Sequence, residues 1–248
     1  MLADLAMACK LCKKDKKLMN SHIIPEFIYK PLYDEKHRFH VISTYKQKDR
    51  PKEQKGIRER LLCLDCEQHI SRYEDYARKV LFGGVEISVL NESGGIIVSE
   101  IDYKLFKLFQ LSILWRASVS NHKMFKNVRL GPHESIIRQM IRSDRPGKER
   151  EYCCVMIAIK SESDAMSSFI DQPEKRRISG HVVYRFIFGS IAWVYFVASH
   201  NVPKIIREFV LSETGTVRMA IKDIKDMDCI AGFARKAHSM GRFPDEIA

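Results

Sequence analysis

Apolar and polar positions alternate along the chain in a way that predicts a short N-terminal group of elements. Residues 21–25 predict a short strand that ends at a proline, and the polar residues 41–56 predict a loop. Over residues 70–81 apolar side chains recur at helical spacing, until two glycines end the pattern. This part of the chain is therefore expected to contain a hairpin followed by one helix.

Beyond residue 84 the pattern predicts helices and strands in separate runs. Residues 103–119 predict a helix that is apolar on most faces, which suits a buried central element. The sequence predicts strands at residues 87–101 (a hairpin), 152–159, 181–198 (a second hairpin) and 217–221, and further helices after Pro132 and at residues 228–239. Such separate runs are typical of an α+β fold. We expect two domains, residues 1–84 and 85–248, the larger built on an antiparallel sheet.

The size and composition of the chain predict a folded protein. It has 248 residues, of which 45% are hydrophobic, enough to form a core. The longest apolar stretch, residues 186–198, is interrupted by Gly and Ser and is shorter than the roughly 20 residues that span a bilayer. Residues 2–8 are mostly apolar but contain Asp4 and lack a basic leader, so a secretory signal is not expected. These features predict a cytoplasmic protein without a membrane partner.

Four of the seven cysteines form two C-x-x-C pairs, Cys9 with Cys12 and Cys63 with Cys66. One tight turn can direct both thiolates of a pair at the same ion, and two pairs complete the tetrahedron that zinc prefers. The second pair falls at the predicted helix N-terminus, where the helix dipole favours thiolate. We therefore predict a structural Zn²⁺ bound by these four cysteines in a treble-clef arrangement. A redox pair is the alternative interpretation.

Basic residues are concentrated near the cysteines. The formal net charge of the chain is +11, and residues 1–84 hold 18 Lys and Arg against 12 Asp and Glu, a net +6. Residues 30–60 hold ten basic side chains, interleaved with Tyr33, Phe39 and Tyr45. Such a segment can contact phosphates while aromatic faces meet bases or sugars, although a solvated polar loop is the simpler alternative. The charge pattern predicts nucleic acid as a partner.

Three sequence motifs surround the predicted zinc site: the first C-x-x-C, then SHIIP at residues 21–25, then LLCLDCEQHISRYE at residues 61–74. Together they resemble the zinc-bearing treble-clef branch of the HNH endonuclease family, and with FQLSILWRA at residues 109–117 they resemble a group of bacterial HNH-like proteins. The resemblance implies a ββα-metal fold and a metal-dependent nuclease acting on DNA or RNA. It also implies a role in bacterial antiviral defence.

The resemblance assigns catalytic roles to two further side chains. His22 matches the histidine that activates the attacking water at the end of the family's first strand. Glu67, directly after the second cysteine of the helical pair, matches a ligand of a catalytic Mg²⁺ or Mn²⁺. Phosphodiester hydrolysis needs such a base and such a cation. Ser21 replaces the family's usual acidic ligand, and no asparagine matches the family's middle position between residues 41 and 62.

These side chains also have structural interpretations. His22 could instead be a buried imidazole that holds the hairpin, or a zinc ligand in place of a cysteine, and Glu67 could complement the helix dipole. Glu74 lies seven residues after Glu67, about two helical turns away, so the two are not expected to bind one ion.

Three functions therefore stay open. They are an HNH-type nuclease, a catalytically inactive zinc module that binds nucleic acid, and a protein-interaction component. For residues 85–248, a protein partner and a second copy of the chain are both left open.

Overall fold

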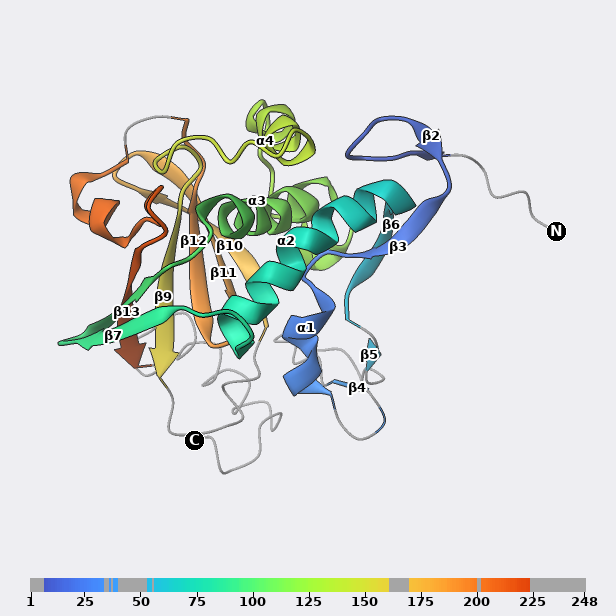
Figure 1. Cartoon of the computed structure of the whole chain (residues 1–248). Coiled ribbons are helices and arrows are strands. Elements are labelled where there is room, and N and C mark those ends of the chain that lie inside the picture. The colour runs from blue at the N-terminus through green and yellow to red at the C-terminus, as the bar shows by residue number, and fades with distance from the viewer. Residues whose placement is uncertain are drawn as a thin grey trace, which may run out of the picture.

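A seven-stranded sheet forms the larger part of the molecule (Figure 1). The computed structural model describes residues 7–33, 36, 38–39, 53–54, 56–160, 170–199 and 202–223. The strands are β7 (Ser88–Glu92), β8 (Gly95–Ser99), β9 (Cys154–Lys160), β10 (Asp171–Ile178), β11 (His181–Phe188), β12 (Ile191–Phe196) and β13 (Val217–Asp223). Their order across the sheet is β10-β11-β12-β9-β13-β8-β7.

The sheet is mixed, which corrects the prediction of an antiparallel one. β13 pairs with β9 in parallel, while the other neighbouring strands pair antiparallel. Parallel neighbours need a crossover connection of about a dozen residues or more, and between β9 and β13 the chain forms the three strands β10, β11 and β12. The short helix η4 (Lys204–Phe209) also belongs to this connection and contacts both β9 and β13.

The helix α3 (Tyr103–Val119) is the central element, as its apolar sequence predicts. The side chain of Asp102 caps it by accepting a hydrogen bond from the Leu105 N–H at 2.9 Å. The rings of Phe106 and Phe109 lie 6.3 and 6.0 Å from Trp193 of β12, so aromatic packing joins the helix to the sheet. Helices α2 (Leu64–Phe82) and α4 (His133–Arg142) both contact α3.

The N-terminal segment is built on a hairpin that leads directly into α2. Strands β3 (Leu18–His22) and β6 (Arg58–Cys63) pair antiparallel, and α2 begins at the next residue. The segment also contains β1 (Met7–Ala8), β2 (Asp15–Lys16), α1 (Glu26–Tyr29), η1 (Lys30–Leu32), β4 (Arg38–Phe39) and β5 (Glu53–Gln54); η2 (Lys123–Phe125) lies between α3 and α4. Phe27 stacks on Phe109 with ring centroids 6.1 Å apart, so one core continues across residue 84. The domain boundary there stays a prediction.

Some of the sequence predictions concern residues that the structure does not describe. The predicted helix at residues 228–239 and most of the loop at 41–56 lie outside the described residues, as does most of the basic segment 30–60. Strand β10 was not predicted, because Pro173 and a run of charged residues interrupt its apolar alternation. Among the described residues, no helix is long and apolar enough to cross a membrane.

Candidate metal centre and the adjoining charged cluster

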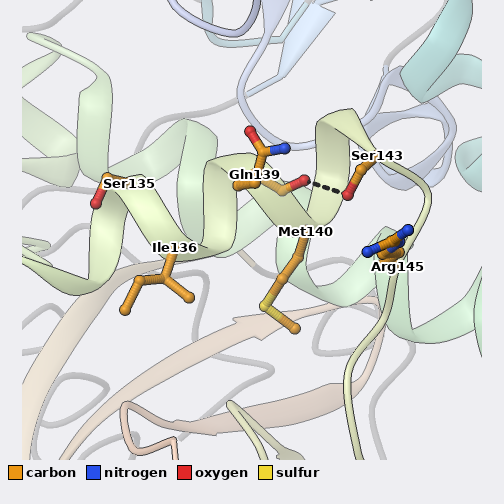
Figure 2. A pocket seen from close by; sticks show the side chains of 6 residues that line it. All are labelled: Ser135, Ile136, Gln139, Met140, Ser143 and Arg145. Carbon is orange, nitrogen blue, oxygen red and sulfur yellow. Dashed lines mark hydrogen bonds between the residues drawn. The ribbon is translucent and has the colours of Figure 1, made fainter.

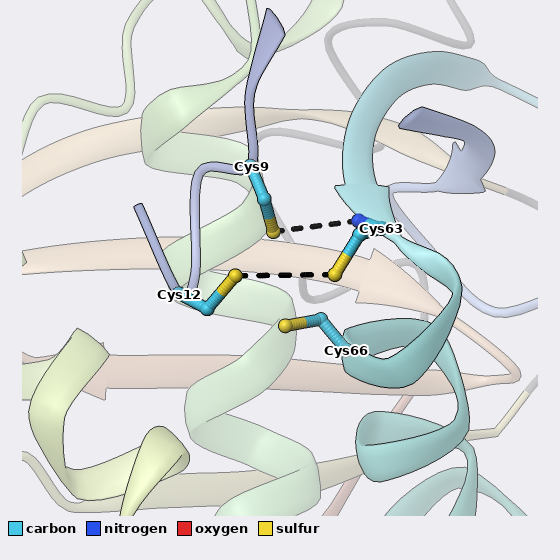
Figure 3. Close-up of side chains that lie close together, drawn as sticks. All are labelled: Cys9, Cys12, Cys63 and Cys66. Carbon is cyan, nitrogen blue, oxygen red and sulfur yellow. Dashed lines mark hydrogen bonds between the residues drawn. The ribbon is translucent and has the colours of Figure 1, made fainter. Parts of the chain in front are cut away.

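The structure brings Cys9, Cys12, Cys63 and Cys66 together into one group (Figure 3). Their Sγ atoms all lie within 4.8 Å of one another, and the Sγ atoms of Cys12 and Cys63 are 3.9 Å apart. A tetrahedron with Zn–S bonds of about 2.3 Å has edges of about 3.8 Å, whereas a disulfide would need about 2.05 Å. The spacing therefore fits four thiolates around a metal ion such as zinc.

The turn between β1 and β2 positions the first cysteine pair. The Lys13 N–H donates to the Cys9 carbonyl at 2.8 Å, and the Cys9 N–H donates to the Lys14 carbonyl at 3.0 Å. Lys13 adopts a left-handed conformation with φ of 62°, which closes the turn. The Lys10 N–H donates to the Leu61 carbonyl at 2.9 Å, which fixes this turn, the knuckle of residues 9–14, against β6.

The junction of β6 and α2 positions the second pair. Cys63 occupies the N-cap of α2, and Cys66 lies in its first turn, both buried. The Cys63 N–H donates to the Cys9 Sγ at 3.3 Å. A backbone donor and the positive end of a helix dipole both stabilise negative charge on sulfur. The sequence-predicted position of this pair at a helix N-terminus agrees with the structure.

The four thiols differ in how readily they ionise. Burial alone raises the pKa of Cys12, but the Lys14 backbone N–H and the neighbouring thiols lower it to about 7. Burial raises the pKa of Cys63, and it raises that of Cys66 well above the usual range of a thiol. Four thiolates this close together, three of them buried, repel one another, so their full ionisation requires a cation at the centre.

Lysines surround the knuckle. Lys10, Lys13, Lys14, Lys16 and Lys17 accompany the first cysteine pair, and Lys13, Lys14 and Lys17 are exposed. Asp65, at the start of α2, pairs with Lys16 at 2.5 Å. The knuckle is also tied to α4, because Arg138 Nη1 donates to the Leu11 carbonyl at 3.0 Å. Helix α4 therefore lies beside the lysines of the candidate metal centre.

His22 ends β3, and its side chain is directed at a charged pair rather than at the cysteines. Arg58 Nε donates to His22 Nε2 at 2.8 Å, and the same ring nitrogen contacts the Glu26 carboxylate. Glu26 also accepts from Tyr33 Oη and Arg58 Nη2, each at 2.9 Å. Although burial opposes it, these donors lower the pKa of Glu26. The contacts with Arg58 join β3 to β6 and to α1.

Glu67 lies on the inner side of α2, within a cluster that also contains Ser21, Glu74 and Arg116. Burial raises the pKa of Glu67, while Ser21 and Arg116 oppose this shift. Arg116 Nη2 lies 2.6 Å from a Glu74 carboxylate oxygen. Arg116 Nη1 donates to the backbone carbonyl of His22 at 2.8 Å. The positive charge among these carboxylates is thus the guanidinium of a residue from α3.

The structure places His22 and Glu67 among different partners. The imidazole of His22 meets Glu26 and Arg58, while Glu67 faces Ser21 and Arg116. Within the described ranges, the four cysteines are the one group of three or more His, Cys, Asp or Glu side chains spaced to hold a metal ion. The sequence analysis did not identify the charge partner of Arg116, although an arginine inside an apolar helix signals a buried counter-ion.

A second polar network joins α2 to the end of α4. His69 Nε2 lies 2.8 Å from the Ile141 carbonyl, and Tyr73 Oη lies 2.8 Å from the same His69 nitrogen. Tyr73 Oη donates to Asp144, whose carboxylate also accepts from Arg72 Nη2 at 3.2 Å. These bonds fix the end of α4 against α2.

No family model, no curated protein and no solved structure matches this chain.

Proposed function

We propose that this protein binds nucleic acid, and that a structural Zn²⁺ at Cys9, Cys12, Cys63 and Cys66 holds the binding surface in shape. The observation that carries the proposal is the four-cysteine knuckle, which presents exposed lysines and is hydrogen-bonded by Arg138 to a helix that ends at Arg142 and is followed by Arg145. The proposal also includes the treble clef that the sequence predicts.

The ligand set supports a structural rather than a catalytic zinc. Four thiolates fill the tetrahedron, whereas a catalytic zinc keeps one position open for water or substrate. Cys9, Cys63 and Cys66 are buried, which separates the ion from bulk solvent. An ion at this position would join the knuckle to the start of α2, and so stabilise a small segment with a limited core of its own.

The charge around the knuckle supports an anionic partner. Residues 9–18 contain five lysines and one acidic residue, Asp15. Four thiolates and one Zn²⁺ carry a net charge of about −2, and the five lysines carry more positive charge than is needed to balance it. Because phosphate contacts release condensed counterions, such a surface gains affinity from each neutralised phosphate.

The cluster around Glu67 favours binding over hydrolysis. A catalytic Mg²⁺ or Mn²⁺ on Glu67 would compete with the guanidinium of Arg116, which is paired with Glu74 and 1% exposed. Breaking a buried ion pair by removing one partner costs about 3–5 kcal/mol. The resident arginine therefore disfavours a divalent ion at this position.

A nuclease of HNH type is the second candidate, and one observation favours it. His22 ends the first strand of a β3-β6-α2 unit, is 18% exposed, and contacts the carboxylate of Glu26. A carboxylate in contact with an imidazole can hold it in the orientation that a general base requires. On this alternative, His22 would activate water and Glu67 would bind the catalytic ion.

Salt-dependent binding tests the first proposal. Zinc-loaded protein would be titrated with labelled DNA and RNA over a range of salt concentrations, and compared with the double variant Lys13→Gln, Lys14→Gln. The plot of log K against log salt should lose about 0.9 in slope for each phosphate contact removed. The matched control neutralises Lys126 and Lys175, which are exposed near η2 and on β10. Binding that ignores salt, or no binding to either nucleic acid, would leave the protein-interaction function as the better account.

A further inference from the structure

Helix α4 has one buried face and one broad exposed face. Ile137 and Ile141 are fully buried, while Ser135, Gln139 and Arg142 are exposed. At about 100° per residue, Gln139 points almost opposite to the mean direction of the two isoleucines. The exposed face is therefore centred on Gln139.

Two acidic side chains near α4, Glu134 and Asp144, are engaged by residues of other helices. Glu134 accepts a hydrogen bond from Trp115 Nε1 at 2.6 Å, and Asp144 is engaged by Tyr73 and Arg72. Arg142 and the following Arg145 are exposed, and in the part of the chain that is described neither forms an ion pair. The outer surface of α4 thus has basic and neutral polar groups without a paired carboxylate.

An open depression of about 590 Å³ lies along this surface (Figure 2). Figure 2 shows Ile136 and Met140 on one side of the helix, Gln139 on another, and Arg145 beyond the helix end. Ser135 and Ser143 complete the lining. The surface therefore combines a guanidinium, an amide, two hydroxyls and two apolar side chains between residues 135 and 145.

Helix α4 is held firmly in its position. Arg138 bonds to the knuckle at Leu11, and the Ile141 carbonyl is contacted by His69 of α2. The knuckle and α4 thus lie side by side, as the top of Figure 1 also shows. A preorganised helix loses little conformational entropy when it binds a partner.

We propose that α4 enters the major groove of double-stranded DNA and reads base edges through Gln139, while the lysines of the knuckle contact the adjoining phosphates. This inference rests on the proposed nucleic-acid binding and names its class. A helix of about 10–12 Å diameter fits the major groove of B-DNA, which is about 12 Å wide. The deep and narrow major groove of duplex RNA excludes it.

The side chains of α4 have the chemistry that base reading uses. A glutamine amide can form two hydrogen bonds with the N6 and N7 atoms of adenine, and an arginine can do the same with the O6 and N7 atoms of guanine. Gln139, Arg142 and Arg145 supply these groups, and Ile136 supplies an apolar contact for a thymine methyl.

The experiment uses the zinc-loaded full chain and three probes of equal length: duplex DNA with a randomised centre, duplex RNA, and single-stranded DNA. We expect duplex DNA to bind most tightly, and repeated selection to enrich a short motif. Gln139→Ala should reduce discrimination at one base pair by about tenfold, the loss expected for one bidentate contact. Zinc content and melting temperature should stay unchanged because Gln139 is exposed. Lys175→Gln on β10 is the control and should retain the motif.

Each other outcome has a distinct meaning. Equal or tighter binding of duplex RNA or single-stranded DNA overturns this inference and leaves the proposed function standing. An unchanged motif and discrimination in both Gln139→Ala and Arg142→Gln also overturns it, because α4 would then not read the bases. Binding to none of the three probes overturns both the inference and the proposed function.

Discussion

The guanidinium of Arg116 lies 2.6 Å from the carboxylate of Glu74, and this pair joins α3 to α2, the two longest helices among the described residues. Arg116 is 1% exposed and Glu74 is 21% exposed. The same guanidinium donates to the His22 carbonyl at 2.8 Å, so this one side chain of α3 contacts both α2 and β3. Because the charge of Arg116 also acts on Glu67, removing it would leave two carboxylates without their counter-ion.

Arg116→Met should destabilise the protein more than a typical surface substitution. It leaves Glu74 and Glu67 in a poorly solvated site without a cation, and the free energy of unfolding should fall by about 3–5 kcal/mol. Denaturant unfolding measures this change. The double variant Arg116→Met, Glu74→Met should recover part of the loss, since it removes one of the two orphaned carboxylates. A single variant within about 1 kcal/mol of the parent would show that the pair contributes no more than an exposed one.

Cys63→Ser should release zinc. Metal analysis of the parent should give close to one Zn²⁺ per chain, because four cysteines supply one complete tetrahedron. In the variant, zinc affinity should fall by about 100-fold or more, beyond the effect of disturbing a group that only orients a ligand. Cys153→Ser is the control, since Cys153 is buried outside the cluster and its loss should not change the zinc content. A metal-free parent that is fully folded would contradict the site.

Lys107 should make stability rise with pH in the alkaline range. Burial lowers its pKa to about 8, although neighbouring carboxylates and Cys153 oppose the shift. Between about pH 8 and the ordinary value of 10.5, the unfolded chain binds the proton more tightly than the folded one, so folding becomes more favourable as pH increases. Below about pH 8 both states hold the proton, and the contribution becomes constant.

The comparison of the parent with Lys107→Met isolates this effect from other alkaline titrations. Denaturant unfolding from pH 7.5 to pH 9.5 should show a slope difference of up to about 1.4 kcal/mol per pH unit. The variant also removes the bonds from Lys107 Nζ to the carbonyls of Lys148 and Glu149, so the two curves should also differ by an offset that does not depend on pH. Parallel curves for the two proteins would show that the Lys107 pKa is not lowered.

Plasmid DNA should be bound without being cleaved. Arg116 supplies the positive charge beside Glu67, which leaves little electrostatic demand for a divalent ion. Incubation with Mg²⁺, Mn²⁺ or chelator, followed by gel electrophoresis, measures this. Metal-dependent cleavage that falls by about 100-fold or more in His22→Ala, with zinc and stability retained, would instead establish the nuclease and identify His22 as its base.

If the protein does not cleave nucleic acid, His22→Ala tests whether this side chain has only a structural role. The imidazole receives a hydrogen bond from Arg58 and contacts Glu26, so its removal should lower the free energy of unfolding by about 1 kcal/mol. Nucleic-acid affinity should stay within about twofold of the parent, because the knuckle lysines and α4 are untouched. Loss of zinc in this variant would show that His22 supports the metal centre.

The sequence by itself was sufficient for the local features of this protein. Spacing identified the two cysteine pairs, because a metal-binding turn needs its ligands only a few residues apart. Helical periodicity predicted α2 and α4, since each of them buries one face that recurs along its own sequence. Helix α3 was predicted from a stretch that is apolar on most faces, as in a buried helix. Strand β10 was not predicted because an edge strand tolerates charged residues and proline, which interrupt the alternation of apolar and polar residues.

The tertiary structure alone decided the relationships between distant segments. The partner of Arg116, the contact of Arg138 with Leu11 and the parallel pairing of β13 with β9 each join positions far apart in the chain. A local pattern shows that a side chain is buried, but the identity of its neighbour depends on how whole helices and strands pack. For this reason the sequence did not predict the guanidinium that packing brings from α3 to the vicinity of Glu67.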